Sequence, residues 1–244
     1  MKPSCKTSCV AILLAGGAST RMKGQNKLFT DIGGIPTMAW PLKALSSNKS
    51  IAAIQPVISK PISEIFNMLL DTMQSDKLLP PVYGGSTRSS STFNALKATE
   101  HLGFEWALVH DAARPFLNDE MISAGLESAK LTGASIAAMP TTDSIKLCHM
   151  DGTLQLNLDR NRTWMAQTPQ IASFSLLLKA HKFHANELDK FTDESAILHS
   201  YGAKVQIFEG SPWNIKLTTE ADLVLARHFA DSGLVTPQHS GKHG

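Results

Sequence analysis

The feature of this sequence that most constrains the fold is a regular alternation of short apolar runs with segments of helical periodicity. Continuous apolar runs, which are typical of strands buried on both faces, lie at residues 9–14, 106–110 and 134–139. An extended β-branched segment lies at residues 51–58, and apolar residues recur at helical spacing over residues 37–46, 61–73, 89–101 and 118–131. The alternation predicts an α/β fold with a mostly parallel sheet flanked by helices and joined by right-handed crossovers.

Residues 142–160 interrupt this alternation. Two short segments, 144–149 and 153–158, flank Asp151 and Gly152. An Asp-Gly pair between such segments is the strongest short-range signal for a β-hairpin. We therefore expect a β-hairpin arm that projects from the domain.

Length and composition favour a single domain. The chain has 244 residues, of which 43% are hydrophobic, enough to bury a substantial core. We expect one domain over residues 1–231 and a flexible tail over residues 232–244, where Ser, Gly, Pro, Gln and His predominate. Because the sequence contains neither a run typical of a transmembrane helix nor a signal-peptide pattern, we expect a cytoplasmic protein without a membrane partner.

Charge and cysteine content exclude other classes of protein. Lys and Arg total 23 against 21 Asp and Glu, and a net charge of +2 is too small for a protein that binds nucleic acid through its overall charge. The three cysteines, Cys5, Cys9 and Cys148, match no zinc or disulfide framework, which favours a reducing compartment. The histidines show no metal-ligand arrangement, so we predict no zinc site.

The loop at residues 15–27, after the first predicted strand, has the composition of a phosphate-binding loop. It holds three glycines and the cations Arg21, Lys23 and Lys27, without an acid. Glycine lets backbone N–H groups approach an anion, and Arg and Lys supply donors and charge. The spacing matches neither the P-loop nor the dinucleotide fingerprint, and a solvated turn remains the alternative interpretation.

Two further loops also follow predicted strands, where ligands of a parallel sheet bind. Residues 84–91 combine two glycines with several hydroxyls before a helix, which fits either a ligand-binding loop or a plain helix cap. Asp111 follows a buried strand, as a magnesium-binding carboxylate often does, although a turn residue paired with Arg114 is the commoner arrangement.

Later segments carry weaker signals. Lys216 lies between apolar residues in segment 214–218, which we interpret as the end of a strand, with the lysine facing solvent. Residues 192–194, Thr-Asp-Glu, are expected to open a helix.

Together these motifs occur in the order found in one known family. They are residues 15–22 with Lys27, Gly84 and Gly85 with Arg88 and Ser91, residues 109–115, Asp159 with Arg160, Trp164 with residues 166–170, residues 192–194 and residues 214–216. Over about residues 10–230 the chain resembles the 2-C-methyl-D-erythritol 4-phosphate cytidylyltransferases of the nonmevalonate isoprenoid pathway.

The resemblance implies a Rossmann-like nucleotidyltransferase fold with a β-arm that clasps a second subunit in a homodimer. It implies that a phosphate oxygen of methylerythritol phosphate, a polyol phosphate, attacks the α-phosphorus of CTP in the presence of Mg²⁺ and releases pyrophosphate. No covalent enzyme intermediate forms in such a reaction, so positioning and charge stabilisation would supply the catalysis.

Roles for individual residues follow from the resemblance. Arg21 and Lys27 would hold the triphosphate, Lys216 would act at the reacting phosphate, and Asp111 would hold Mg²⁺. The nucleotide-binding residues would be Ala15, Gly16, Gly17, Gly85, Ser91 and Ala112. The acceptor substrate would contact Arg114, Ser144, Thr168 and, across the dimer interface, Arg160.

Three positions depart from the family pattern, and other functions remain alternatives. Asn26 replaces a common proline, Ser86 a frequent acid near the cytidine, and Ser144 a threonine whose hydroxyl it keeps. The alternatives are a ribitol 5-phosphate cytidylyltransferase and, from another class, a catalytically silent nucleotide-binding regulatory domain. Retention of the cations and of Asp111 argues against a silent domain.

Overall fold

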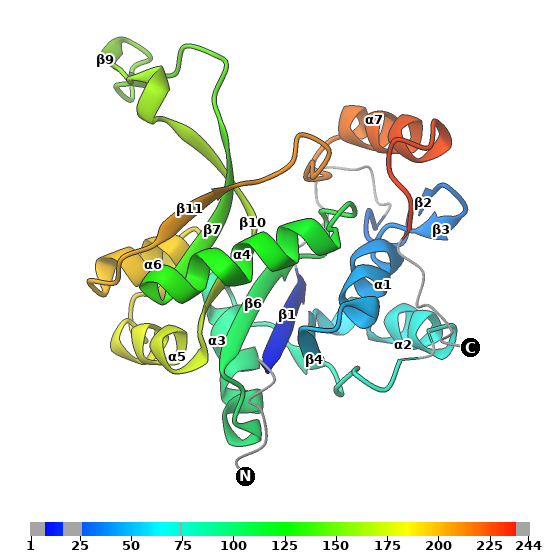
Figure 1. Ribbon diagram of the computed structural model, residues 1–244. Helices are drawn as coiled ribbons and strands as arrows, with labels where there is room; N and C mark the ends of the chain where they lie inside the picture. Colours follow the sequence, from blue (N-terminus) through cyan, green and yellow to red (C-terminus); the bar gives the residue numbers. More distant parts are fainter. Residues whose placement is uncertain (1–7, 17–25, 74, 238–244) are drawn as a thin grey trace.

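The computed structural model describes residues 8–16, 26–73 and 75–237, and this part of the chain contains a seven-stranded sheet flanked by helices (Figure 1). Its strands are β1 (Cys9–Ala15), β4 (Ile51–Ile58), β5 (Val82–Tyr83), β6 (Trp106–Asp111), β7 (Ala134–Pro140), β10 (Trp164–Ser173) and β11 (Gln206–Glu209). Within the described ranges they lie in the order β11-β7-β10-β6-β1-β4-β5, and only β10 runs antiparallel to its neighbours. The predicted mostly parallel α/β sheet is confirmed.

Helices cover both faces of this sheet. They are α1 (Ala39–Ser47), α2 (Ser63–Asp71), α3 (Arg88–Thr99), α4 (Asp119–Thr132), α5 (Phe174–Phe183), α6 (Glu194–Ser200) and α7 (Glu220–Asp231), with short 3₁₀ turns η1 (Lys60–Ile62), η2 (Glu100–Leu102), η3 (Arg160–Arg162) and η4 (Leu188–Lys190). Local sequence sets their ends. Asn118 caps α4 by accepting a hydrogen bond from the Met121 N–H, and Gly133, at φ 90°, ends it.

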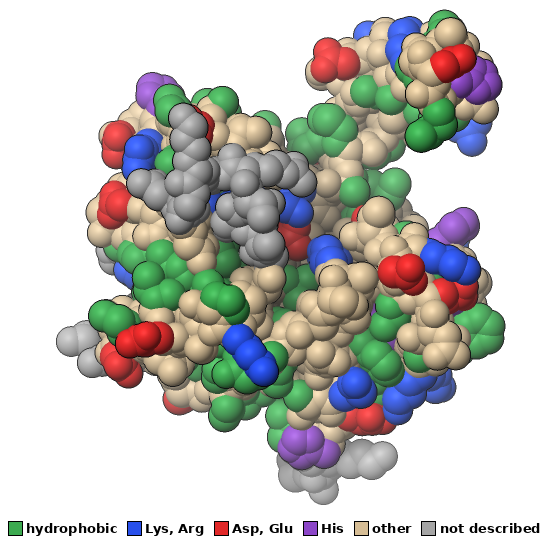
Figure 2. Space-filling view, turned by 180° about the vertical axis from the view of Figure 1, so that it is seen from behind, with side chains coloured by type: hydrophobic (Ala, Val, Ile, Leu, Met, Phe, Trp, Pro, Cys, Tyr) green, Lys and Arg blue, Asp and Glu red, His purple; other side chains and the backbone are tan. Residues whose placement is uncertain are grey.

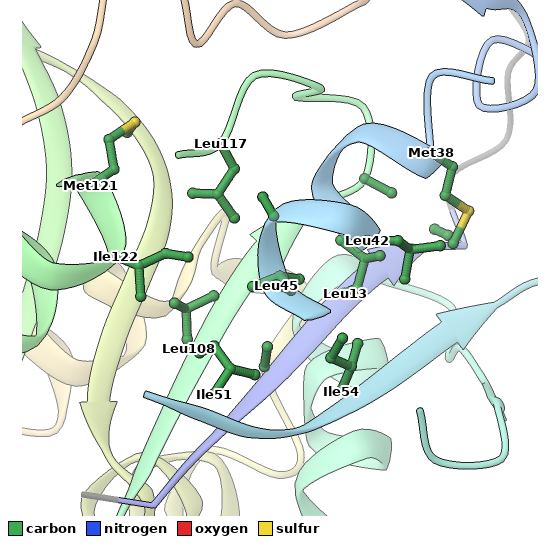
Figure 3. Packing of buried hydrophobic residues seen from close by; sticks show 14 of the residues in the cluster. Leu13, Met38, Leu42, Leu45, Ile51, Ile54, Leu108, Leu117, Met121 and Ile122 are labelled. Atoms are coloured by element: carbon green, nitrogen blue, oxygen red, sulfur yellow. The ribbon is translucent and has the colours of Figure 1, made fainter. Parts of the chain in front are cut away.

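The core lies on the two faces of the sheet because successive side chains of a strand point in opposite directions. In β1, Ala11 and Leu13 pack with α1, α2 and α4, a cluster seen from close by in Figure 3. Val10 and Ile12 pack with α3, α5 and α6 on the other face. A smaller cluster joins α7 to the β2 (Asp31–Ile32) and β3 (Ile35–Pro36) hairpin.

Close packing of α4 requires a glycine. A Cβ atom at Gly125 would lie 2.7 Å from Cδ1 of Ile171 and 2.9 Å from Cζ of Phe208. The missing side chain therefore lets α4 lie directly against β10 and β11.

The arm is a separate two-stranded hairpin of β8 (Lys146–Cys148) and β9 (Leu154–Asn157). Its turn contains Gly152 at φ 86°, a conformation that glycine adopts without strain. The chain leaves the sheet at the end of β7 and returns through β10, so the hairpin stands off the body of the molecule (Figures 1 and 2). Among the residues described, none of the helices combines the length and the apolar character that crossing a membrane requires.

Candidate active site

The carboxyl ends of β1, β4 and β6 meet at one edge of the sheet. The N–H of Ala112 donates to the carbonyl of Leu14 at 2.9 Å, and the N–H of Gly84 donates to the carbonyl of Ile58 at 2.9 Å. These bonds bring the loop after β6 to the end of β1, and the segment before α3 to the end of β4, as the strand pattern predicts. Ala112 is fully buried here.

Asp111, at the end of β6, lies between two cations. Its Oδ1 accepts a hydrogen bond from Nε of Arg88 at 3.0 Å, and its Oδ2 lies 2.7 Å from Nζ of Lys216. The carboxylate is 11% exposed and the lysine 41%. The negative charge of Asp111 is therefore balanced by cations inside the protein, while Lys216 remains open to solvent.

The expectation that residues 214–218 end a strand is wrong. β11 ends at Glu209, and Lys216 lies in the irregular segment that follows. The N–H of Leu217 donates to the carbonyl of Ala113 at 2.8 Å, which ties this segment to the loop after β6. The lysine consequently faces Asp111, a long-range partner that local alternation does not reveal.

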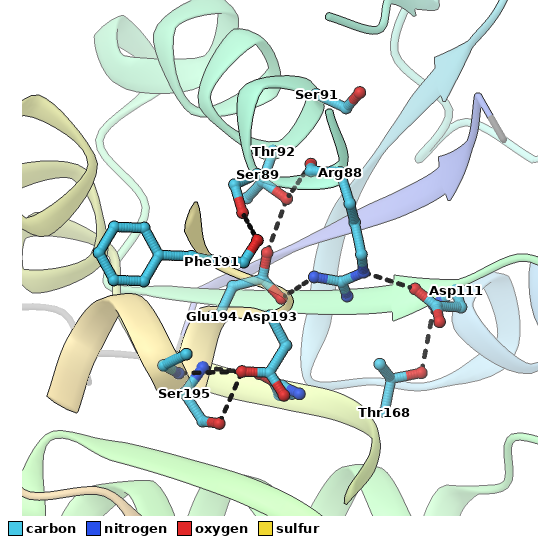
Figure 4. Close-up of polar contacts among 12 residues, drawn as sticks. Arg88, Ser89, Ser91, Thr92, Asp111, Thr168, Phe191, Asp193, Glu194 and Ser195 are labelled. Atoms are coloured by element: carbon cyan, nitrogen blue, oxygen red, sulfur yellow. Dashed lines mark hydrogen bonds and ion pairs between the residues drawn. The ribbon is translucent and has the colours of Figure 1, made fainter. Parts of the chain in front are cut away.

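Arg88 also binds a second acid, Glu194. Its Nη1 lies 2.6 Å from Oε2 of Glu194, whose other oxygen accepts a hydrogen bond from the Thr92 hydroxyl at 2.7 Å (Figure 4). Glu194 opens α6, with Asp193 as its N-cap, so the predicted helix start is confirmed. Its side chain is only 1% exposed.

Charges around Asp111 favour its ionised form. Burial alone would raise the pKa of Asp111, but the positive charges of Arg88, Lys216 and Arg114 more than reverse this and hold it well below its usual range. For Arg88, burial acts to lower the pKa, and the two carboxylates outweigh it and raise the pKa. Both groups are therefore charged throughout the physiological pH range.

A chain of hydrogen bonds supports the backbone of Asp111. Its N–H donates to Oγ1 of Thr168 at 3.2 Å, and that hydroxyl lies 2.9 Å from Nδ1 of His110. Nε2 of His110 lies 3.0 Å from the carbonyl of Arg114, which can only accept, so Nε2 carries the proton and Nδ1 accepts from Thr168. Burial lowers the pKa of His110 to about 4, which keeps the ring neutral.

Arg114 and Asn214 hold the segment that carries Lys216. Arg114 donates to the carbonyl of Asn214 at 2.7 Å and to that of Ala166 at 3.3 Å. The side-chain nitrogen of Asn214 donates to the carbonyl of Thr168 at 2.7 Å. Two guanidinium nitrogens of Arg114, predicted to face the acceptor substrate, thus bind backbone carbonyls.

The loop before α3 is both a helix cap and an exposed surface. Thr87 and Ser90 form a capping box, and the Ser91 hydroxyl accepts from the N–H of Gly85 at 3.1 Å and donates to the Thr87 carbonyl at 2.8 Å. A Cβ atom at Gly85 would lie 2.7 Å from Cβ of Ser90, so glycine is required there. Gly85 and Ser86 nonetheless remain exposed to solvent.

Other predicted residues belong to other segments of the chain, or lie outside the described residues. Gly17 and Arg21 belong to the second group, and nothing in the structure bears on them. Lys27 is partly buried and lies in the segment before β2. Ser144 and Arg160 belong to the arm and its base, where both are exposed.

The donor set is compatible with magnesium only if a substrate supplies further ligands. Among the described residues there is no group of three His, Cys, Asp or Glu side chains that could hold a metal ion. A single carboxylate is sufficient when phosphate oxygens complete the coordination. Asp111 fits this arrangement, because Oδ2 faces the exposed Lys216, whereas Oδ1 is held by the more buried Arg88.

Sequence reasoning assigned no role to Arg88, Glu194 or His110. Arg88 and Glu194 lie 106 positions apart, and no local pattern links them. His110 precedes the predicted acid directly, but its neighbours along the strand are apolar, which gives no sign of its polar contacts.

The mostly parallel sheet with an acid and a solvent-accessible lysine at its carboxyl edge defines the class of an α/β nucleotidyltransferase. The model of the family 2-C-methyl-D-erythritol 4-phosphate cytidylyltransferase (IspD) matches residues 9–231, and the chain belongs to this family.

Relatives and solved structures agree with this assignment. A 2-C-methyl-D-erythritol 4-phosphate cytidylyltransferase of Clostridium novyi is 36% identical over 91% of this chain and 96% of its own length. A bifunctional enzyme IspD/IspF of Bradyrhizobium diazoefficiens is 37% identical over 87% of this chain, which spans 53% of that protein. The crystal structure of 4-diphosphocytidyl-2C-methyl-D-erythritol synthase from Anaerococcus prevotii superposes with a TM-score of 0.82 at 27% identity, covering 93% of this chain and 97% of that one.

Proposed function

We propose that this protein transfers CMP from CTP to 2-C-methyl-D-erythritol 4-phosphate, giving 4-diphosphocytidyl-2-C-methyl-D-erythritol and pyrophosphate. The observation that carries the proposal is the 2.7 Å ion pair of Lys216 with Asp111 at the carboxyl edge of the sheet, in a chain of this family. It supports the proposal because a cation that is open to solvent lies beside a carboxylate that would hold a metal.

In this reaction a phosphate oxygen of the acceptor attacks the α-phosphorus of CTP. The bond from that phosphorus to the bridging oxygen of the β-phosphate breaks, and pyrophosphate leaves with the bonding electrons. Lys216 would bind the reacting phosphate, and Arg21 and Lys27 would hold the triphosphate. Negative charge accumulates around phosphorus in the transition state, so fixed cations lower the barrier more than they strengthen ground-state binding.

Magnesium would complete the charge balance. Oδ2 of Asp111 would be its protein ligand, and the ion would neutralise phosphate charge and orient the triphosphate. Arg88 would keep Oδ1, so that a metal would compete with Lys216 for Oδ2. Phosphate bound at Lys216 would provide that lysine with a replacement anion.

The nucleotide would bind above the carboxyl edge of the sheet. Ala15 ends β1 at this edge and Gly16 follows it, Ala112 follows β6, and Gly85 before α3 is bonded to Ser91 in the first turn of that helix. Their convergence supports a nucleotide site with exposed backbone at Gly85, which replaces the missing acid at Ser86 as a source of polar contacts to the cytidine.

A homodimer formed through the arm would complete the substrate site. The hairpin exposes several large apolar side chains, which favours burial against a partner; they are Leu147, Met150, Leu154 and Leu156. Ser144 and Arg160 flank the hairpin in the sequence, and Arg160 of the partner subunit would contact the acceptor bound at Lys216. Thr168 would act from beneath, by fixing the backbone of Asp111.

The test is pyrophosphate release from CTP and Mg²⁺ with methylerythritol 4-phosphate, with ribitol 5-phosphate, or with no acceptor. Release with methylerythritol phosphate alone is expected. Release with ribitol phosphate alone would transfer the assignment to that acceptor, and silence with both would favour a nucleotide-binding regulatory protein.

A further inference from the structure

A chain of alternating charges runs from the interior of the protein to the proposed reaction centre. The Thr92 hydroxyl donates to Glu194, Glu194 pairs with Arg88, Arg88 pairs with Asp111, and Asp111 pairs with Lys216. The two acids are the more buried members, at 1% exposure for Glu194 and 11% for Asp111, and Lys216 at the outer end is 41% exposed. Glu194 is therefore too deeply buried to contact a substrate, although ion pairs connect it to Lys216, which would bind one.

Arg88 contacts its two acids through different nitrogen atoms. Nε binds Asp111 at 3.0 Å and Nη1 binds Glu194 at 2.6 Å. Because the guanidinium is planar and rigid, fixing Nη1 on one carboxylate also fixes the direction of Nε toward the other. A lysine, which carries one nitrogen, cannot link the two acids in this geometry.

The helix ends that carry this chain are themselves fixed. Arg88 is the first residue of α3, behind the capping box at Thr87. The N–H of Ser195, next to Glu194 in α6, donates to Oε1 of Gln170 at 2.9 Å. The Ser89 hydroxyl donates to the carbonyl of Phe191 at 3.0 Å, which joins the start of α3 to the segment before α6 (Figure 4).

Stability alone is a poor explanation for a buried carboxylate at this place. Removing two charges from water costs several kcal/mol, and apolar replacements of buried ion pairs are often as stable. Among the ion pairs of the described residues, Glu194 nevertheless has one partner, Arg88. Arg88 is also the residue that holds Asp111.

We infer that Arg88 and Glu194 are positioning residues that hold Oδ1 of Asp111, so that Oδ2 is directed to a magnesium ion and to Lys216. Glu194 acts on Arg88, and Arg88 acts on the acid; neither touches the reacting atoms. The inference rests on the proposed function, because it assigns these residues to the metal-binding acid of that reaction.

The experiment compares Glu194→Gln and Arg88→Lys with the native chain. Glu194→Gln keeps the size of the side chain and the Thr92 contact but removes the charge. Arg88→Lys keeps the charge but removes the planar guanidinium that binds both acids. The matched control is Glu127→Gln, which breaks a 2.6 Å ion pair with Lys130 on the exposed face of α4. Electron paramagnetic resonance of Mn²⁺ bound to the enzyme–CTP complex is measured with the steady-state rates.

Both variants are expected to weaken Mn²⁺ binding and kcat by about 10- to 100-fold, as the loss of supporting contacts to a metal ligand does elsewhere, with KM for CTP nearly unchanged. The control is expected to match the native chain in all three. If either variant folds and has native Mn²⁺ affinity and native kcat, the inference is overturned.

A milder variant guards against loss of folding. Thr92→Val removes one hydrogen bond to the Glu194 carboxylate and keeps every charge, and a few-fold loss of Mn²⁺ affinity is expected. Native affinity in Thr92→Val, Glu194→Gln and Arg88→Lys together would exclude a positioning role. If the native chain binds Mn²⁺ with CTP but releases no pyrophosphate with methylerythritol phosphate, the proposed function fails while the Mn²⁺ data still decide the positioning.

Discussion

Thr168 donates its hydroxyl proton to Nδ1 of His110 across 2.9 Å, and this bond joins antiparallel β10 to the end of β6. The same hydroxyl accepts from the N–H of Asp111 at 3.2 Å. One buried threonine thus supports the backbone of the acid and also satisfies Nδ1 of the neighbouring imidazole, whose tautomer is set by the Arg114 carbonyl at Nε2.

Replacing Thr168 by valine keeps the shape of the side chain and removes both bonds. We expect a loss of about 1–3 kcal/mol in the free energy of unfolding, because a buried ring nitrogen and a buried N–H lose their partner. Urea denaturation measures it. Thr168→Ser, which keeps the hydroxyl, is the control, and equal stability of the two variants would contradict this role.

The neutral state of His110 makes stability depend on pH. Its pKa is lowered to about 4 in the folded protein, against about 6.5 in an unfolded chain. Between these values the unfolded chain binds more protons, so stability falls as the pH falls. Through His110, the free energy of unfolding decreases by about 2 kcal/mol between about pH 7.5 and about pH 5. The decrease levels off below about pH 4. Urea denaturation at both pH values, repeated on His110→Gln, should show a smaller decrease in the variant; an equal decrease would remove His110 as the cause.

Lys216→Met should reduce turnover. Loss of a cation that acts on the reacting phosphate is expected to lower kcat with methylerythritol phosphate by about 100-fold or more. Steady-state pyrophosphate release measures this, and Lys130→Met, at an exposed lysine of α4, is the matched control. A kcat within a factor of about two of the native value would exclude Lys216 from the chemistry.

A site shared between subunits should show complementation. Arg160→Ala and Lys216→Met are each expected to be nearly inactive as separate homodimers. After subunit exchange, mixed dimers would contain one site with both native residues, which should restore about a quarter of the native activity. Pyrophosphate release before and after mixing measures it, and no gain despite demonstrated exchange would place Arg160 and Lys216 in the same subunit's site.

Gly125→Ala tests the packing of α4. The added methyl group would meet Ile171 and Phe208 at less than van der Waals distance, so we expect a loss of about 1–3 kcal/mol in the free energy of unfolding. The control is Ala124→Gly, also in α4, which measures the difference in helix propensity alone. Gly103→Ala would be unsuitable, because Gly103 has a positive φ of 72°. An unchanged melting temperature for Gly125→Ala would show that α4 can shift freely.

Local patterns predict much of the fold and little of the site's connectivity. Apolar runs identify β1, β6 and β7, and the Asp-Gly pair identifies the turn of the arm, because these signals depend on neighbouring residues. β10 escapes prediction, since its sequence combines Gln, Thr and Pro and its strand conformation depends on pairing with both β6 and β7.

The contacts of the site are mostly long-range. Asp111 is predictable as a strand-end acid, but its partner Lys216 lies 105 positions away and Glu194, through Arg88, lies 83 away. Hydrophobic periodicity does not reveal contacts between residues so far apart in the sequence. The family resemblance indicates that Lys216 belongs to the site, and only the structure shows which oxygen of Asp111 it faces.

β10 has a double membership. It starts at the base of the arm with Trp164, passes Ala166 and Thr168, and ends in the core at Ser173. The residues beside Arg114 and under Asp111 therefore share a continuous backbone with the part of the molecule that stands farthest from the sheet. Because the base of the arm and the floor of the site belong to one strand, a partner bound at the arm would contact the same stretch of backbone that supports Asp111.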